Sequence, residues 1–178
     1  MAEALALLTI YNVLFFWKAY ANPFSMARSE LLSTYFPTWI WQGREWAKGK
    51  VPKYDPHYWI NAHAHPVLST YYPFQFLGAV ALSWAKIETA FKGFLWIIVL
   101  HMLFGSYGYF CLIFQWSPKL VALFGAITLV YGSYNIKQQS CLVYTIAWFP
   151  WLLLGIAKCS ILLASISFGM MLLAGYYP

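Results

Sequence analysis

The residues best suited to chemistry gather in one polar stretch, residues 28–73, between an apolar N-terminus and an almost wholly apolar remainder. This stretch holds three of the five acids and three of the four histidines of the chain: Glu30, Glu45, Asp55, His57, His63 and His65. Carboxylates and imidazoles transfer protons and bind metal ions. If the protein carries out a reaction, we expect the reacting groups here.

Positive charge is concentrated in the same stretch. Five of the eleven basic residues lie in it: Arg28, Arg44, Lys48, Lys50 and Lys53. Because they stand among tryptophans, they suit anionic lipid headgroups or a phosphate-bearing substrate better than nucleic acid, so we expect no nucleic-acid partner. Arginine would hold a phosphate by two parallel hydrogen bonds and lysine as a point charge. The alternative role of each cation is anchoring to anionic membrane lipid.

Composition places the chain in a membrane. Of its 178 residues, 62% are hydrophobic and 9% are charged, with a net charge of +6. A soluble domain needs far more charge on its surface. We therefore predict an all-α polytopic membrane protein, integral and multi-pass, in which 1–178 form a single transmembrane domain.

Apolar runs define the elements that must position the polar stretch. A helix needs about twenty residues, at about 1.5 Å rise each, to cross the hydrocarbon. The runs predicted to cross are residues 4–21, 66–85, 91–115, 120–135, 141–157 and 161–175. Residues 22–65 form a large loop, in which apolar residues of 29–48 recur at spacings of three and four. This pattern predicts an amphipathic interfacial helix, broken or bent near Pro37.

The acids and histidines of the loop have both chemical and structural interpretations. Glu30 could be a general base, because partial desolvation raises the pKa of a carboxylate, or it could stabilise a helix N-terminus next to Ser29. Asp55 could assist substrate hydroxyls. The residues that could gather around a divalent metal ion are Asp55, His57, His63 and His65. The alternative is interfacial histidines hydrogen-bonded to backbone and headgroups, and His101, alone in an apolar run, is interpreted as a packed histidine.

An ordered set of short motifs runs through the chain. The set comprises Glu30, Tyr35 with Pro37, Gly49-Lys50-Val51-Pro52-Lys53-Tyr54-Asp55-Pro56, Ala64-His65-Pro66, Tyr72-Pro73, Ala147-Trp148-Phe149-Pro150 and Leu173-Ala174-Gly175. In this order the set resembles the YfhO-like membrane proteins of the GT-C glycosyltransferase superfamily. The chain departs from that pattern at Glu30, where Asp is usual, at Tyr54-Asp55, where Trp-Asn is usual, and at Ala64, where Gly is usual.

The resemblance implies a GT-C-like helical bundle whose first large loop is extracytoplasmic and carries interfacial helices. It implies an inverting glycosyltransferase, in a bacterial cytoplasmic membrane, that moves a sugar from a polyprenyl-phosphate-linked donor to a cell-envelope acceptor. Glu30 and Asp55 would then be catalytic. The substrate-binding residues would be Arg44, Lys48, Lys50, Lys53, His57 and His65. Members of the family are longer, so we expect this chain to be the N-terminal part of such a protein, which could be inactive by itself.

The distribution of charge alone predicts a membrane orientation opposite to the one that the resemblance implies. With a cytoplasmic N-terminus, the basic residues of the loop fall on the outer side, against the tendency for positive residues to lie inside. Either the loop is cytoplasmic or its cations bind a ligand, and the resemblance favours the ligand. The alternative function is a non-catalytic membrane transport or scaffold protein, which would place polar groups near the bilayer midplane.

Overall fold

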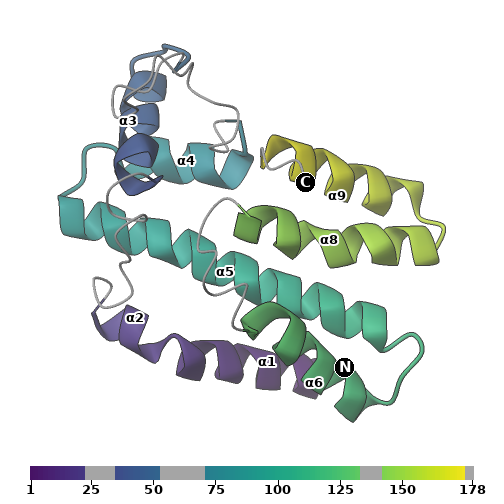
Figure 1. Ribbon diagram of the computed structural model, residues 1–178. Helices are drawn as coiled ribbons and strands as arrows, with labels where there is room; N and C mark the ends of the chain where they lie inside the picture. Colours follow the sequence, from purple (N-terminus) through teal and green to yellow (C-terminus); the bar gives the residue numbers. More distant parts are fainter. Residues whose placement is uncertain (23–34, 53–70, 133–141, 175–178) are drawn as a thin grey trace.

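The computed structural model describes residues 1–22, 35–52, 71–132 and 142–174, and in these ranges all regular structure is α-helical (Figure 1). The all-α prediction is therefore confirmed for the described part of the chain. The helices are α1 (Ala2–Phe15), α2 (Trp17–Ala21), α3 (Phe36–Ala47), α4 (Pro73–Leu82), α5 (Ile87–Ile113), α6 (Lys119–Tyr131), α8 (Leu142–Ala157) and α9 (Ile161–Leu173).

The long helix α5 is the centre of the molecule. It packs against α1, α3, α4, α6 and α8, while α9 packs along α8 (Figure 1). In Figure 1, α1 and α6 lie on one side of α5, and α4 and α8 lie on the other. The largest apolar core is built along α5, from Phe91 and Phe94 near its start to Met102 beyond its middle.

Prolines and a serine mark several helix starts, as their chemistry predicts. Pro73 occupies the first turn of α4, where a missing N–H costs no helical hydrogen bond, and Tyr72 before it is extended, with φ −70° and ψ 119°. Pro37 likewise lies in the first turn of α3. The residues before Tyr35 lie outside the described part of the chain, so the expected break near Pro37 stays a prediction. Ser160 caps α9 by accepting a hydrogen bond from the Leu163 N–H at 3.4 Å.

Polar side chains join α1 to the helices beside it. The buried Asn12 amide donates to the Tyr131 hydroxyl of α6 at 2.8 Å and to the Val99 carbonyl of α5 at 3.4 Å. The Thr9 and Tyr107 hydroxyls lie 2.6 Å apart. Such bonds fix the rotation of one apolar helix against another, which apolar contact alone specifies weakly.

One described helix, α5, is long and apolar enough to cross a membrane. The other apolar helices of the described ranges are shorter, with 10–17 residues. Large apolar side chains are nevertheless exposed on several of them, including Leu14 on α1, Leu120 on α6 and Ile161 on α9. A membrane span at α5 is therefore supported, whereas the predicted six crossings stay a prediction.

Candidate functional site

The structure describes three of the predicted site residues: Arg44, Lys48 and Lys50. The others lie outside the described residues, and these are Glu30, Lys53, Asp55, His57, His63 and His65. In the described part of the chain, no group of three or more His, Cys, Asp or Glu residues could hold a metal ion. The described candidate residues all lie on α3 or just after it: Arg44 is in the helix, and Lys48 and Lys50 follow its last residue, Ala47.

Close packing fixes α3 against α4 and α5 (Figure 1). The buried Trp39 indole donates to the Gln75 carbonyl of α4 at 3.1 Å, and Phe36 meets the Phe91 ring of α5 edge to face at 5.0 Å. Gly43 lies so near α4 that a Cβ atom there would overlap the Ala79 carbonyl oxygen. The remaining face of the helix, which carries Arg44, is exposed, as the amphipathic pattern predicts.

A Schellman motif ends α3 and sets the direction of the chain at the two lysines. Gly49 has the left-handed φ of 72°, its N–H donates to the Trp46 carbonyl at 2.9 Å, and the Lys50 N–H donates to the Glu45 carbonyl at 2.9 Å. Glycine adopts this conformation without a Cβ penalty. Lys48 thus stays at the helix end and Lys50 leaves it, both exposed.

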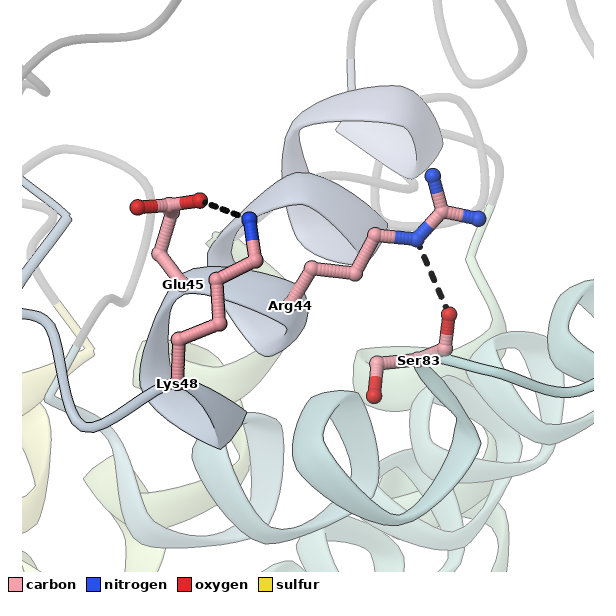
Figure 2. A network of polar contacts seen from close by, with 4 residues as sticks. All are labelled: Arg44, Glu45, Lys48 and Ser83. Carbon is pink, nitrogen blue, oxygen red and sulfur yellow. Dashed lines mark hydrogen bonds and ion pairs between the residues drawn. The ribbon is translucent and has the colours of Figure 1, made fainter.

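Arg44 reaches from α3 to the end of α4 (Figure 2). Its Nε donates to the Ser83 carbonyl oxygen at 3.0 Å, and its guanidinium carbon lies 5.6 Å from the centre of the Trp84 ring. A cation is favoured at a helix C-terminus and over an indole face. The two terminal nitrogens point away from Ser83 in Figure 2, and neither donates a hydrogen bond to a described residue. They are the pair that binds a phosphate in a bidentate contact.

The Arg44 side chain also borders a cavity of about 310 Å³ between α3 and the start of α5. We call this cavity the Arg44 pocket. Its other walls are aromatic or aliphatic: Phe36, Pro37, Ile40, Trp41, Ala85, Ile87 and Ala90. An apolar cavity with one arginine among its lining residues matches an amphiphile that has a hydrocarbon part and an anionic head.

Lys48 is engaged on another side of α3 (Figure 2). Its ammonium group lies 2.8 Å from the Glu45 carboxylate, and this hydrogen bond holds the pKa of the Glu45 carboxyl below its ordinary value. An exposed pair of this kind contributes little to stability. Among the predicted cations that are described, Arg44 is the one that is held by a second helix and that lines a cavity.

A second polar group, which we call the Tyr72 cluster, lies within the helix bundle and comprises Tyr72, His101 and Trp148. His101 Nδ1 lies 2.6 Å from the Ile97 carbonyl oxygen, which can only accept, so Nδ1 carries a hydrogen. In the neutral ring Nε2 then accepts from the Tyr72 hydroxyl at 2.5 Å, and that hydroxyl accepts from Trp148 Nε1 at 2.8 Å. The interpretation of His101 as a packed, hydrogen-bonded histidine agrees with this geometry.

Sequence reasoning did not place the Tyr72 cluster. It singled out Tyr72 and Trp148 as parts of two separate motifs, and the structure joins them across 76 positions of the chain. Nearby, the Gln75 amide nitrogen donates to the Tyr144 hydroxyl, and Gln75 Oε1 is buried without a partner among the described residues. A signal was present in the sequence, because polar residues in apolar runs need partners, but it does not tell which residues pair.

Comparison with known proteins identifies no relative: no family model, no curated protein and no solved structure matches the chain. The geometry of the Arg44 pocket is therefore the main guide to function.

Proposed function

We propose that this protein is a multi-pass integral-membrane glycosyltransferase that holds the phosphate of a polyprenyl-phosphate-linked sugar at the Arg44 pocket. The single observation that carries the proposal is that Arg44 lines a cavity whose other lining residues are apolar or aromatic. Nε is engaged by Ser83 and the ring of Trp84 lies beside it, so the terminal nitrogens are preoriented. A lipid-linked phosphate has the matching chemistry, with an anionic head and an apolar chain.

The chemistry of such a transfer assigns roles to the predicted residues. As the sugar leaves the carrier, negative charge grows on the departing phosphate, and a nearby guanidinium stabilises it. A carboxylate removes the proton of the acceptor hydroxyl, and Glu30 is proposed for this role with Asp55 as the second acid. Lys50, exposed at the last position of the Schellman motif, adds positive charge near the same helix end.

Membership of the YfhO-like branch of the GT-C superfamily is part of this proposal. It is supported by the ordered motif set of the sequence and by the all-helical architecture. The bacterial cytoplasmic membrane as location and an extracytoplasmic site follow from the same resemblance. Several crossings are supported by the large apolar side chains that α1, α6 and α9 expose, because lipid is the environment in which such surfaces are stable.

A transport protein is the second candidate, and the Tyr72 cluster favours it. His101 lies near the middle of α5, the helix that is long enough to cross a membrane, and buried Gln75 Oε1 lacks a described partner. Polar groups at that depth are typical of transport pathways. The nitrogens of His101 and Trp148 and the Tyr72 hydroxyl are all engaged by one another or by the backbone. We therefore rank transport below the transferase.

Binding of a polyprenyl phosphate to the purified protein tests the Arg44 pocket. Arg44→Gln removes the charge and the bidentate donor pair, so binding should weaken about tenfold or more, because a hydrogen bond to a charged group contributes about 1.5–3 kcal/mol. Arg44→Lys keeps the charge but loses the planar pair and should give an intermediate affinity. The measurement is a titration with tritium-labelled polyprenyl phosphate in detergent micelles.

Lys158→Gln is the matched control. It removes one positive charge from the exposed end of α8, where Lys158 makes no ion pair with a described residue. Affinity should be unchanged in this variant. If Arg44→Gln and Lys158→Gln weakened phosphate binding equally, the loss of affinity would be due to the lower net charge of the protein. That result would reject the Arg44 pocket as the phosphate site.

A further inference from the structure

A second cavity, of about 320 Å³, lies beside the middle of α5. We call it the midspan cavity. Its apolar walls come from α4 and α5 and include Phe74, Ile97, Leu100 and Phe104. Leu100 stands at the midpoint of α5, whose range is Ile87–Ile113. If α5 crosses the bilayer, this cavity lies at the depth of the hydrocarbon centre, about 15 Å from either headgroup region.

The polar side chains in the wall of the midspan cavity are His101 and Trp148. Both ring nitrogens of His101 are engaged, by the Ile97 carbonyl and the Tyr72 hydroxyl, and the Trp148 N–H is engaged by the same hydroxyl. These side chains therefore present carbon surface, and no free donor or acceptor, to an occupant. Ordered water needs two to four polar partners, so the wall favours an apolar occupant over water or a polar ligand.

The mouth of the cavity is apolar as well. Phe74 and Leu100, which line it, are 48% and 52% exposed. Leu77 and Trp96 on the same two helices are also exposed. An occupant thus enters across a hydrocarbon-like surface at the middle of the helix, a depth that the chain ends of bilayer lipids reach and that headgroups do not.

We propose that the midspan cavity binds the acyl chain of a bilayer phospholipid, which inserts between α4, α5 and α8. This inference rests on the proposed membrane placement but not on the proposed transferase activity. A chain in this position gains dispersion contacts with the Phe74, Phe104 and Trp148 rings, which close packing makes favourable. The lipid thereby fills the gap between α4 and α8 and shields the Tyr72 cluster.

Photolabelling tests the proposal. The full chain is reconstituted in phosphatidylcholine nanodiscs in which some lipid carries a diazirine near the methyl end of one acyl chain. After illumination, labelled peptides are identified by mass spectrometry. We expect adducts at Leu100 and Phe104, and we expect fewer of them when the diazirine is placed near the headgroup. Equal labelling by the two probes would overturn the assignment of a chain end.

Two variants separate the cavity from general lipid contact. Leu100→Trp fills the mouth and should reduce labelling of Phe104 several-fold. Leu77→Trp makes the same change at a residue that is 61% exposed on α4 and does not line the cavity, and it should leave that labelling unchanged. Ile97→Phe fills the cavity from another wall and replaces Leu100→Trp if that variant does not fold. Labelling of Phe104 that persists in the filled variants would overturn the proposal.

Competition distinguishes the source of the chain. Polyprenyl phosphate should not displace the phospholipid adduct, and displacement would assign the cavity to the isoprenoid of the proposed donor instead. Extraction of membranes with alkaline carbonate tests the membrane placement separately. Release of the protein would reject that placement, whereas retention without labelling at Leu100 and Phe104 would reject only the acyl-chain site.

Discussion

At the scale of single residues, two polar arrangements in the described part of the chain, at Arg44 and at the Tyr72 cluster, differ in character. Arg44 is exposed, is held at Nε by Ser83, and directs its terminal nitrogens away from Ser83. The Tyr72 cluster is turned inward and satisfies its own donors and acceptors. A preoriented, exposed cation suits ligand binding, whereas a closed hydrogen-bond chain suits structural specificity. We therefore treat Arg44 as the candidate binding residue and the Tyr72 cluster as a feature of helix packing.

The Tyr72 hydroxyl should be important for stability. Tyr72→Phe leaves His101 Nε2 and the Trp148 N–H without their partner in the bundle interior, and we expect a loss of about 1–3 kcal/mol in the free energy of unfolding. Tyr11→Phe is the control, because the Tyr11 hydroxyl makes no hydrogen bond with a described residue. Denaturant unfolding in detergent measures both variants. Similar losses in the two would mean that the Tyr72 hydroxyl is not coupled to its neighbours.

A substitution of Glu30, the proposed general base, tests the proposed chemistry most directly. Glu30→Gln keeps the size of the side chain but removes the proton acceptor, so sugar transfer should fall about 10²-fold or more. If Glu30 only stabilises a helix terminus, the change should cost about 0.3–1 kcal/mol and leave transfer nearly intact. Transfer is measured in membranes with protein abundance checked in parallel. Near-normal transfer at normal abundance would move the role of base to Asp55.

At the scale of elements, α3 is the helix that brings the site together. Its position depends on a close contact with α4, because Gly43 lies against the Ala79 backbone. The contact places Arg44 beside Ser83 and Trp84 at the end of α4. The Arg44 pocket therefore depends on helix packing that no property of Arg44 itself specifies.

Gly43→Ala tests the dependence on this contact. The new methyl group would overlap the Ala79 carbonyl, so α3 must move away from α4, and we expect a loss of about 1–3 kcal/mol together with weaker phosphate binding. Gly169→Ala on α9 is the control, since its Cβ would meet no described atom within 4 Å. That change should be neutral or stabilise the protein by up to about 1 kcal/mol, because alanine is the better helix former. Thermal unfolding and phosphate titration on both variants decide the matter, and equal behaviour would refute the role of the contact.

At the scale of the whole molecule, the described helices are organised around one of membrane-crossing length, with shorter apolar helices against it. Exposed apolar side chains on the outer helices, such as Leu14 and Ile161, fit a lipid environment. The number of crossings is the property that most directly separates the proposed multi-pass arrangement from one in which α5 alone spans the bilayer.

Reporter fusions can count the crossings. Fusions after Lys92, Lys119, Lys137 and Lys158 should alternate between the two sides of the membrane, because short connections make neighbouring helices antiparallel. Paired reporters that are active on opposite sides of the membrane provide the measurement. Two consecutive fusions on the same side would remove the crossing between them, and a shared side after Lys92 and Lys119 would remove α5 itself.

The sequence by itself determined that the described part of the chain is helical and where most of its helices lie. The predicted range 120–135 contains most of α6, and 161–175 contains α9, because apolar runs and the positions of proline and glycine are local signals. The sequence also predicted Arg44, together with Lys48, Lys50 and Lys53, as a cation for a phosphate or for anionic lipid, and this role stays a prediction. Whether the predicted runs cross a membrane is a separate matter that helix bounds alone do not decide.

Only the tertiary structure decided which residues meet. Arg44 is paired with Ser83 across 39 positions, and Trp148 with Tyr72 across 76. In a chain that is 62% hydrophobic, many helix faces could bury similar apolar area, so hydrophobic pattern does not select one pairing. The selection comes from close backbone approach, as at Gly43, and from the need of each buried polar group for a partner. Both depend on the three-dimensional arrangement of helices that are distant in the sequence.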